Sequence, residues 1–127
     1  MPEFNMTVPA TTIWYDTGVD LDGTAKSVTI TATGQWTANP ATGMVEPDGN
    51  AQYIGKPGYA MEGEYEGLLV GKVSADGQAF AIGSSGSVAP GAIGELYLSI
   101  NDDVNAQYGV GFPDNEGSVD VVITVDV

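Results

Sequence analysis

The sequence predicts an all-β protein, folded as one β-sandwich, and three observations lead to this. The 127 residues include 18 glycines and 7 prolines, which interrupt helices and recur in turns. No long stretch repeats apolar residues with a helical period, whereas several short stretches alternate with the two-residue period of a strand. The length is sufficient for one domain with its own hydrophobic core. We therefore expect antiparallel strands joined by Gly- and Pro-rich loops.

Four segments carry the strongest strand patterns. Residues 26–33, 95–100 and 118–125 alternate, so that one face of each strand is apolar. Residues 67–73 form a nearly continuous apolar run, which is typical of a central strand covered on both faces. These four segments are expected to supply most of the core.

Weaker signals complete the set of strands. Residues 78–82 follow Ala75-Asp76-Gly77, a hairpin turn in which Gly accepts a positive φ. Residues 12–15 are expected to form the first strand. Two long irregular stretches remain, at 34–66 and 101–117. Loops longer than about 12–15 residues in a compact domain are usually functional or disordered.

The ends of the chain and the tryptophans complete the expected organisation. Residues 1–6 resemble a tail added in cloning, because Glu3-Phe4 is what a common cloning site encodes, and a single domain then covers residues 7–127. Trp14 and Trp36 stand beside strand positions, and we assign both to the core because aromatic side chains are first of all large hydrophobes.

Charge and composition exclude several functions. Seventeen acidic residues against 3 lysines give a net charge of −14, which argues against nucleic acid and anionic membranes but suits divalent cations and neutral ligands. The absence of cysteine and histidine excludes disulfides, thiolate metal sites, Ser-His-Asp catalysis and the commonest zinc ligand. No apolar run approaches the roughly 20 residues of a membrane span, so we expect no membrane insertion.

Catalysis is not expected either. Two carboxylates can hydrolyse a glycoside, and a chain with 17 acidic residues offers many pairs. A glycosidase, however, needs a deep cleft and a carboxylic acid with a raised pKa, and a small sandwich with exposed acidic loops offers little for either. We therefore expect a non-enzymatic protein.

One region of the sequence points to a binding site. The strand ending in Ile100-Asn101-Asp102-Asp103 is followed a dozen residues later by Asp114-Asn115-Glu116-Gly117-Ser118. Hard cations such as calcium bind several carboxylate, amide and carbonyl oxygens at once. The alternative is a solvated strand end, since Asp and Asn are common turn residues.

The sequence also resembles a known family, the calcium-dependent galactophilic lectins of the LecA type and their bacterial relatives. The resemblance covers about residues 12–127, and its order and spacing are more specific than any one piece. It is carried by the following segments: Gly34-Gln35-Trp36, Pro47-Asp48-Gly49, Gly67 to Val73, Gly91 to Asp102, and Asp114-Asn115-Glu116-Gly117-Ser118.

The resemblance implies a jelly-roll-like sandwich of two antiparallel sheets with calcium at one end. The metal ligands it implies are the side chains of Asp102, Asp114 and Asn115 and backbone carbonyls at about Asn39 and Gln107. The sugar-binding residues it suggests are these: Asn39, Gln52, Tyr53, Asp102, Asp103 and Asp114. The chain departs from the family in lacking its sugar-contacting histidine and in having a longer loop between Asp102 and Asp114.

Two functions follow as expectations. The first is a calcium-dependent carbohydrate-binding module whose cofactor is Ca²⁺ and whose partner is a sugar, galactose or a related one. The second is a structural or adhesion domain of a larger extracellular bacterial protein, in which calcium only stabilises loops. The resemblance implies a secreted or cell-surface location, and assembly into a homo-oligomer is compatible with both.

Overall fold

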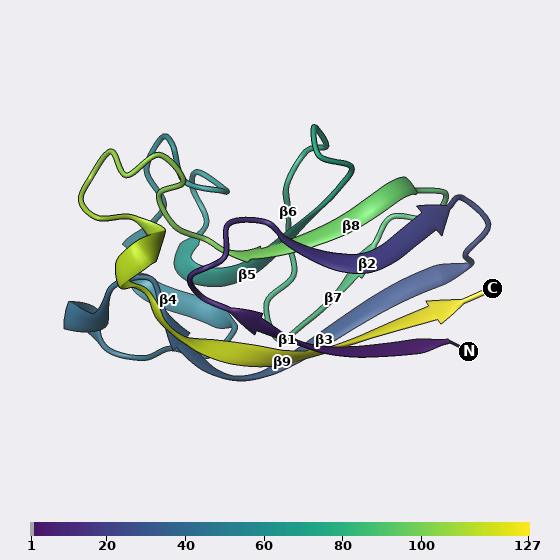
Figure 1. The fold of residues 1–127 in the computed structure, drawn as a ribbon, viewed down its shortest axis with the longest axis horizontal. Helices are drawn as coiled ribbons and strands as arrows, with labels where there is room; N and C mark the ends of the chain where they lie inside the picture. Colours follow the sequence, from purple (N-terminus) through teal and green to yellow (C-terminus); the bar gives the residue numbers. More distant parts are fainter. Residues whose placement is uncertain (1) are drawn as a thin grey trace.

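Two antiparallel sheets lie face to face in the computed structural model, which describes residues 2–127 (Figure 1). The first sheet has the order β1-β9-β3-β7, and the second has the order β2-β8-β5-β4 with β6 paired to β5. The strands and two short 3-10 helices have these bounds: β1 Glu3–Pro9, β2 Tyr15–Asp22, β3 Ser27–Thr37, η1 Pro40–Thr42, β4 Asp48–Ile54, β5 Tyr65–Val73, β6 Phe80–Ala81, β7 Ser85–Val88, β8 Ile93–Ile100, η2 Phe112–Asp114 and β9 Glu116–Asp126. The predicted all-β sandwich of two antiparallel sheets is confirmed.

The first sheet is built on the long pairing of β3 with β9. The pairing runs in unbroken register from Ser27 opposite Asp126 to Thr37 opposite Glu116. Alternation along both strands turns their apolar residues toward the second sheet, as the sequence predicts. The buried residues on this face are these: Val28, Ile30, Ala32, Val119, Val121 and Ile123.

The second sheet is built on β5 and β8. The segment Gly67 to Gly71 is buried throughout, which confirms the prediction of a strand covered on both faces. Opposite it, β8 contributes Leu96, Leu98 and Ile100, all fully buried. The predicted hairpin after β5 is present, since β6 pairs back onto Val70 and Gly71, but the positive φ in its turn is at Ser74 (73°) and not at Gly77 as expected.

Trp36 joins the two sheets. It is fully buried, and its indole Nε1 donates a hydrogen bond of 2.8 Å to the carbonyl oxygen of Gly67 on β5. The prediction that Trp36 belongs to the core is therefore confirmed. The prediction for Trp14 is wrong: Trp14 is only half-buried in a turn at φ 50°, with the Lys72 ammonium 4.5 Å from its ring centroid.

Several elements differ from the sequence expectation. The first predicted strand, 12–15, is a turn up to Trp14, and β2 begins at Tyr15. Residues 3–6, expected as a tail, form part of β1 and pair with residues 121–124 of β9. The strands β1, β4 and β7 lie at sheet edges: β1 and β4 carry mostly exposed residues and so lack the alternation that reveals a half-buried strand, and β7, with four residues, is too short to show it clearly.

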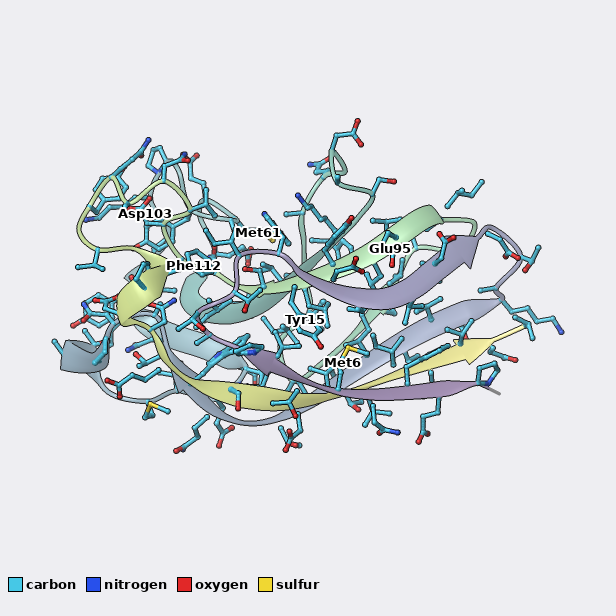
Figure 2. The ribbon with its side chains drawn as sticks, viewed as in Figure 1. Met6, Tyr15, Met61, Glu95, Asp103 and Phe112 are labelled. Atoms are coloured by element: carbon cyan, nitrogen blue, oxygen red, sulfur yellow. The ribbon has the colours of Figure 1, made fainter. Side chains whose placement is uncertain are left out.

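The loops that matter for function gather at one end of the sandwich. In Figure 1 both termini lie at the right, while the loop between β8 and β9 and the loop between β4 and β5 lie together at the left. Figure 2 shows Asp103 and Phe112 at this same end. The two long irregular stretches of the sequence thus meet in space.

Candidate functional site

A cavity of about 280 Å³ lies at the loop end of the sandwich. Its walls come from the segment after β3, from β5 and from both loops. The lining residues are these: Ala38, Asn39, Tyr59, Glu66, Asp102, Asp103, Tyr108, Gly109, Val110, Gly111 and Asp114. The sequence-predicted residues Asn39, Asp102, Asp103 and Asp114 are thereby brought together.

Asn101 fixes the position of the loops around this cavity. Its fully buried side chain accepts a hydrogen bond of 2.7 Å from Met61 N. Its amide group donates to three carbonyl oxygens, those of Met61 at 2.9 Å, Glu64 at 3.3 Å and Tyr65 at 3.1 Å. A single side chain at the end of β8 therefore holds the β4–β5 loop in place.

Asp102 presents a buried carboxylate with one unused oxygen. The residue is 4% exposed, and its Oδ1 accepts a hydrogen bond of 2.7 Å from Asp103 N. Oδ2 is buried and has no hydrogen-bond partner among residues 2–127. The pKa of Asp102 is raised from 3.8 to about 6: burial is the main cause and the charges of Glu66 and Asp114 add to it, while the hydrogen bond from Asp103 N and the nearby Asn115 amide oppose it.

Asn115 presents a second unused oxygen. The side chain is 5% exposed, and its Nδ2 donates a hydrogen bond of 2.9 Å to the carbonyl of Ala10. Because that carbonyl can only accept, the amide orientation is settled and the free atom is Oδ1. Oδ1 is likewise buried without a partner in the described part of the chain. The Asn115 amide lies close enough to Asp102 to lower its pKa, but within residues 2–127 Nδ2 forms a hydrogen bond only to Ala10, and Asp102 Oδ2 has no partner.

These two oxygens are what a hard cation requires. Leaving a buried polar atom unsatisfied costs about 1–3 kcal/mol, more for a charged group, and native proteins rarely accept this without a partner. Buried charges are paired or bind metals. Asp102, with its unpaired carboxylate oxygen, shares the cavity wall with the exposed Asp114, whereas Asn115, with its unpaired amide oxygen, follows Asp114 in the chain and is not itself part of the lining. This donor set fits calcium.

The candidate calcium ligands are of three kinds: the carboxylates of Asp102 and Asp114, the amide of Asn115, and backbone carbonyls. Within residues 2–127 no group of three or more His, Cys, Asp or Glu side chains is arranged to hold a metal. A calcium site built from two carboxylates, one amide and backbone carbonyls contains no such group.

Asp103 has a different role from Asp102. Both of its oxygens accept backbone hydrogen bonds, Oδ1 from Asn105 N at 3.1 Å and Oδ2 from Tyr108 N at 2.7 Å. Asp103 therefore shapes the beginning of the β8–β9 loop and is itself satisfied. Asp103 lines the cavity, and its contact with a sugar stays a prediction.

The two predicted carbonyl donors are placed differently. Asn39 lines the cavity, but its carbonyl already accepts hydrogen bonds from Thr42 N at 3.0 Å and Thr42 Oγ1 at 2.9 Å. Gln107 is exposed, lies outside the lining and packs its side chain against Gly58. The backbone of Gly109 to Gly111, just after Gln107, lines the cavity instead.

The predicted sugar contacts Gln52 and Tyr53 are not at the cavity. Both lie on β4, where they are exposed, Tyr53 at 41%, and neither is part of the lining. The aromatic residues that do line it are Tyr59 and Tyr108, with ring centroids 6.2 Å apart. In the sequence, nothing in the local pattern distinguishes Tyr59 from Tyr53 or Tyr65.

Tyr108 and Glu66 were not predicted. The Tyr108 hydroxyl donates a hydrogen bond of 2.8 Å to Pro57 O, which holds the side chain in place. The Lys56 ammonium lies 4.9 Å from the centroid of the Tyr108 ring. Glu66 precedes the apolar part of β5, and its Oε2 accepts a hydrogen bond of 2.8 Å from the Tyr59 hydroxyl. The only signal for Tyr108 is its place in a long loop that was expected to be functional.

Comparison with known proteins gives one informative result. No protein-family model matches the chain, and no curated protein matches it. Among solved structures, it is similar to one described as "EclA N-terminal domain; PllA-like lectin", with a TM-score of 0.71 over 97% of this chain and 96% of that chain. The sequence identity is 20%, so the likeness establishes a shared fold, that of a lectin β-sandwich. No helix within residues 2–127 is long and apolar enough to cross a membrane.

Proposed function

We propose that this protein is a calcium-dependent carbohydrate-binding module. One observation carries the proposal: Asp102 Oδ2 and Asn115 Oδ1 are buried without partners, and the cavity that Asp102 lines is also lined by Asp114. The shared fold with a lectin domain supports the choice of a carbohydrate as ligand. The net charge of −14 agrees with a cation as cofactor.

The side chains of Asp102, Asp114 and Asn115 would hold the calcium, and backbone carbonyl oxygens of the cavity wall, from Ala38 and from residues 109–111, would complete the set. When bound, calcium offers coordination positions to which sugar hydroxyls bind. Asn101 and Asp103 keep the two loops in position, so that the ligands are ordered before binding and little entropy is lost.

The size and walls of the cavity favour a small ligand. Cavities that bury drug-sized ligands measure about 300–1,000 Å³, and this one lies just below that range. Tyr59 and Tyr108 provide aromatic surface for the CH groups of a pyranose ring. We therefore favour one terminal sugar residue over an extended chain.

A glycosidase is less consistent with the geometry. Asp102 has the raised pKa of a general acid, but such an acid must reach the glycosidic oxygen of the substrate. Asp102 is 4% exposed, and the oxygen without a partner is buried. The geometry therefore favours binding over hydrolysis.

A glycan array probed with calcium and then with EDTA tests the proposal. We expect binding to one or more glycans in calcium and complete loss in EDTA. Binding that is unchanged by EDTA would contradict the mechanism. If calcium raises the melting temperature but no glycan is bound, the protein is a structural domain stabilised by the ion.

A further inference from the structure

We propose that Glu66, positioned by Tyr59, is the hydrogen-bond acceptor that selects the sugar, and that the ligand is a neutral sugar with a hydroxyl directed at β5. This inference rests on the proposed function and concerns the same cavity. It assigns a role to two residues that the metal site does not use.

The geometry leaves one oxygen of Glu66 for a ligand. Oε2 is occupied by the Tyr59 hydroxyl at 2.8 Å. Within residues 2–127 no hydrogen-bond donor contacts Oε1 of Glu66, and this oxygen is accessible to solvent. Since Glu66 lines the cavity, its free oxygen is available to a molecule bound there.

Tyr59 fixes the polarity of this position. Burial is the main cause that raises the pKa of the Tyr59 phenol well above its ordinary value, and the hydrogen bond to Glu66 adds to it. The phenol therefore keeps its proton at every physiological pH and always donates to Oε2. The remaining oxygen of Glu66 can only accept, so the ligand must provide a donor.

The charges around the cavity favour a neutral ligand over an anionic one. Four carboxylates line the cavity, those of Glu66, Asp102, Asp103 and Asp114, and a calcium ion offsets two of these charges. The Lys56 ammonium is the nearby cation, and it lies over the outer Tyr108 ring. An anionic sugar would meet net repulsion, whereas the hydroxyls of a neutral pyranose can donate to carboxylates.

Glu66→Gln is a sharp test because it inverts the polarity without changing the shape. The Tyr59 hydroxyl will bind the amide oxygen, so the amide nitrogen must face the cavity as a donor. We expect at least about tenfold weaker sugar binding, since hydrogen bonds to charged groups carry more energy than neutral ones. In the double variant Tyr59→Phe with Glu66→Gln, the amide can turn its oxygen to the cavity, and we expect partial recovery.

The experiment is isothermal titration in calcium with methyl β-galactoside, methyl α-mannoside, methyl α-fucoside and N-acetylneuraminic acid. A separate titration with calcium alone measures metal binding. Glu62→Gln, an exposed residue of the loop that leads into β5, is the matched control. We expect Glu66→Gln to bind calcium within about twofold of the wild type and to lose the neutral sugar, while Glu62→Gln binds both normally.

Each other outcome has a distinct meaning. If Glu66→Gln loses calcium, Glu66 is a metal ligand and the inference is wrong. If it binds the neutral sugar as the wild type does, Glu66 has no part in selection. If wild-type protein binds N-acetylneuraminic acid as tightly as any neutral sugar, the charge argument fails. If the wild type binds calcium but none of the four sugars, the proposed function itself fails and this inference fails with it.

Discussion

At the scale of single residues, the fold leaves two side-chain oxygens buried without hydrogen-bond partners among residues 2–127. Asp102 Oδ2 and Asn115 Oδ1 are buried, while the neighbouring polar groups of Asn101 and Asp103 are satisfied. Because the neighbouring polar groups all have hydrogen-bond partners, the two unpaired oxygens indicate a site for a ligand more than poor packing. Both residues are among the metal ligands that the sequence predicts, because strand ends and Asp/Asn pairs are visible in one dimension.

Asp102→Asn should have opposite effects on stability with and without calcium. In EDTA the variant removes a buried, uncompensated charge, so we expect its melting temperature to rise by roughly 3 °C or more. In excess calcium the wild type gains stability by mass action, about 2.7 kcal/mol at a hundred times Kd, and the variant does not. Differential scanning calorimetry in both buffers measures this. A variant that is less stable than the wild type in EDTA would show that the charge is compensated within the chain.

The pH dependence in EDTA follows from the raised pKa. Asp102 takes up its proton at about pH 6 in the folded protein, against an ordinary value of 3.8. Its contribution to the free energy of unfolding is therefore fully present below about pH 4 and is lost as pH rises through 6. Urea unfolding of wild type and Asp102→Asn should show the advantage of the variant at pH 7.5 shrinking by pH 5. A constant difference across this range would contradict the assignment.

At the scale of elements, the site depends on two loops that are held together by side chains. The β4–β5 loop is fixed by Asn101, and the β8–β9 loop by Asp103 and by the Tyr108 hydroxyl. The Asn101 and Tyr108 side chains contact residues 40 and 51 positions away in the chain, whereas the Asp103 contact to Tyr108 N spans 5. No local pattern reveals the long-range contacts, which is why the sequence gives no sign that Tyr108 and Glu66 line the cavity or that Gln52 and Tyr53 lie outside it.

Asn101→Ala should loosen this arrangement. The change leaves Met61 N and up to three carbonyl oxygens without the Asn101 amide, and each buried group without a partner costs about 1–3 kcal/mol. We expect a loss of at least about 2 kcal/mol in the free energy of unfolding, measured in urea. Hydrogen exchange should show faster exchange in residues 55–64. Unchanged exchange there would mean that the loop is held by other contacts.

Buried strands can be predicted from the sequence, whereas the edge strand β4 cannot. The segments 26–33, 67–73, 95–100 and 118–125 are all strands, because burial on one or both faces imposes a readable pattern. The strand β4 has no such pattern, since residues 51–54 are exposed and its pairing is shifted between Asn50 and Ile54. Edge strands are defined by their partners more than by their own residues.

At the scale of the whole molecule, the two sheets are joined close to the cavity. Trp36 on β3 donates to Gly67 on β5, and Glu66, which lines the cavity, is the residue before Gly67. The sandwich core and the binding end are therefore coupled through adjacent backbone positions. The sequence placed Trp36 in the core but could not show that it spans the sheets.

Trp36→Phe should weaken this connection. The variant keeps an aromatic ring but removes the donor, leaving the Gly67 carbonyl without its buried partner and creating unfilled volume. We expect a loss of about 2–4 kcal/mol in the free energy of unfolding and weaker calcium binding. Chemical unfolding with and without calcium measures both effects. Wild-type stability in Trp36→Phe would show that the hydrogen bond contributes nothing net.

The measurement that tests the central claim most directly is isothermal titration of the metal-free protein with calcium. We predict one saturable site in the wild type, lost in Asp102→Asn and in Asn115→Ala. Asp76→Asn, in the exposed turn after β5, should bind as the wild type does. Calcium binding that persists unchanged in both site variants, or that is absent from the wild type, would contradict the assignment of the two unpaired oxygens to a cation.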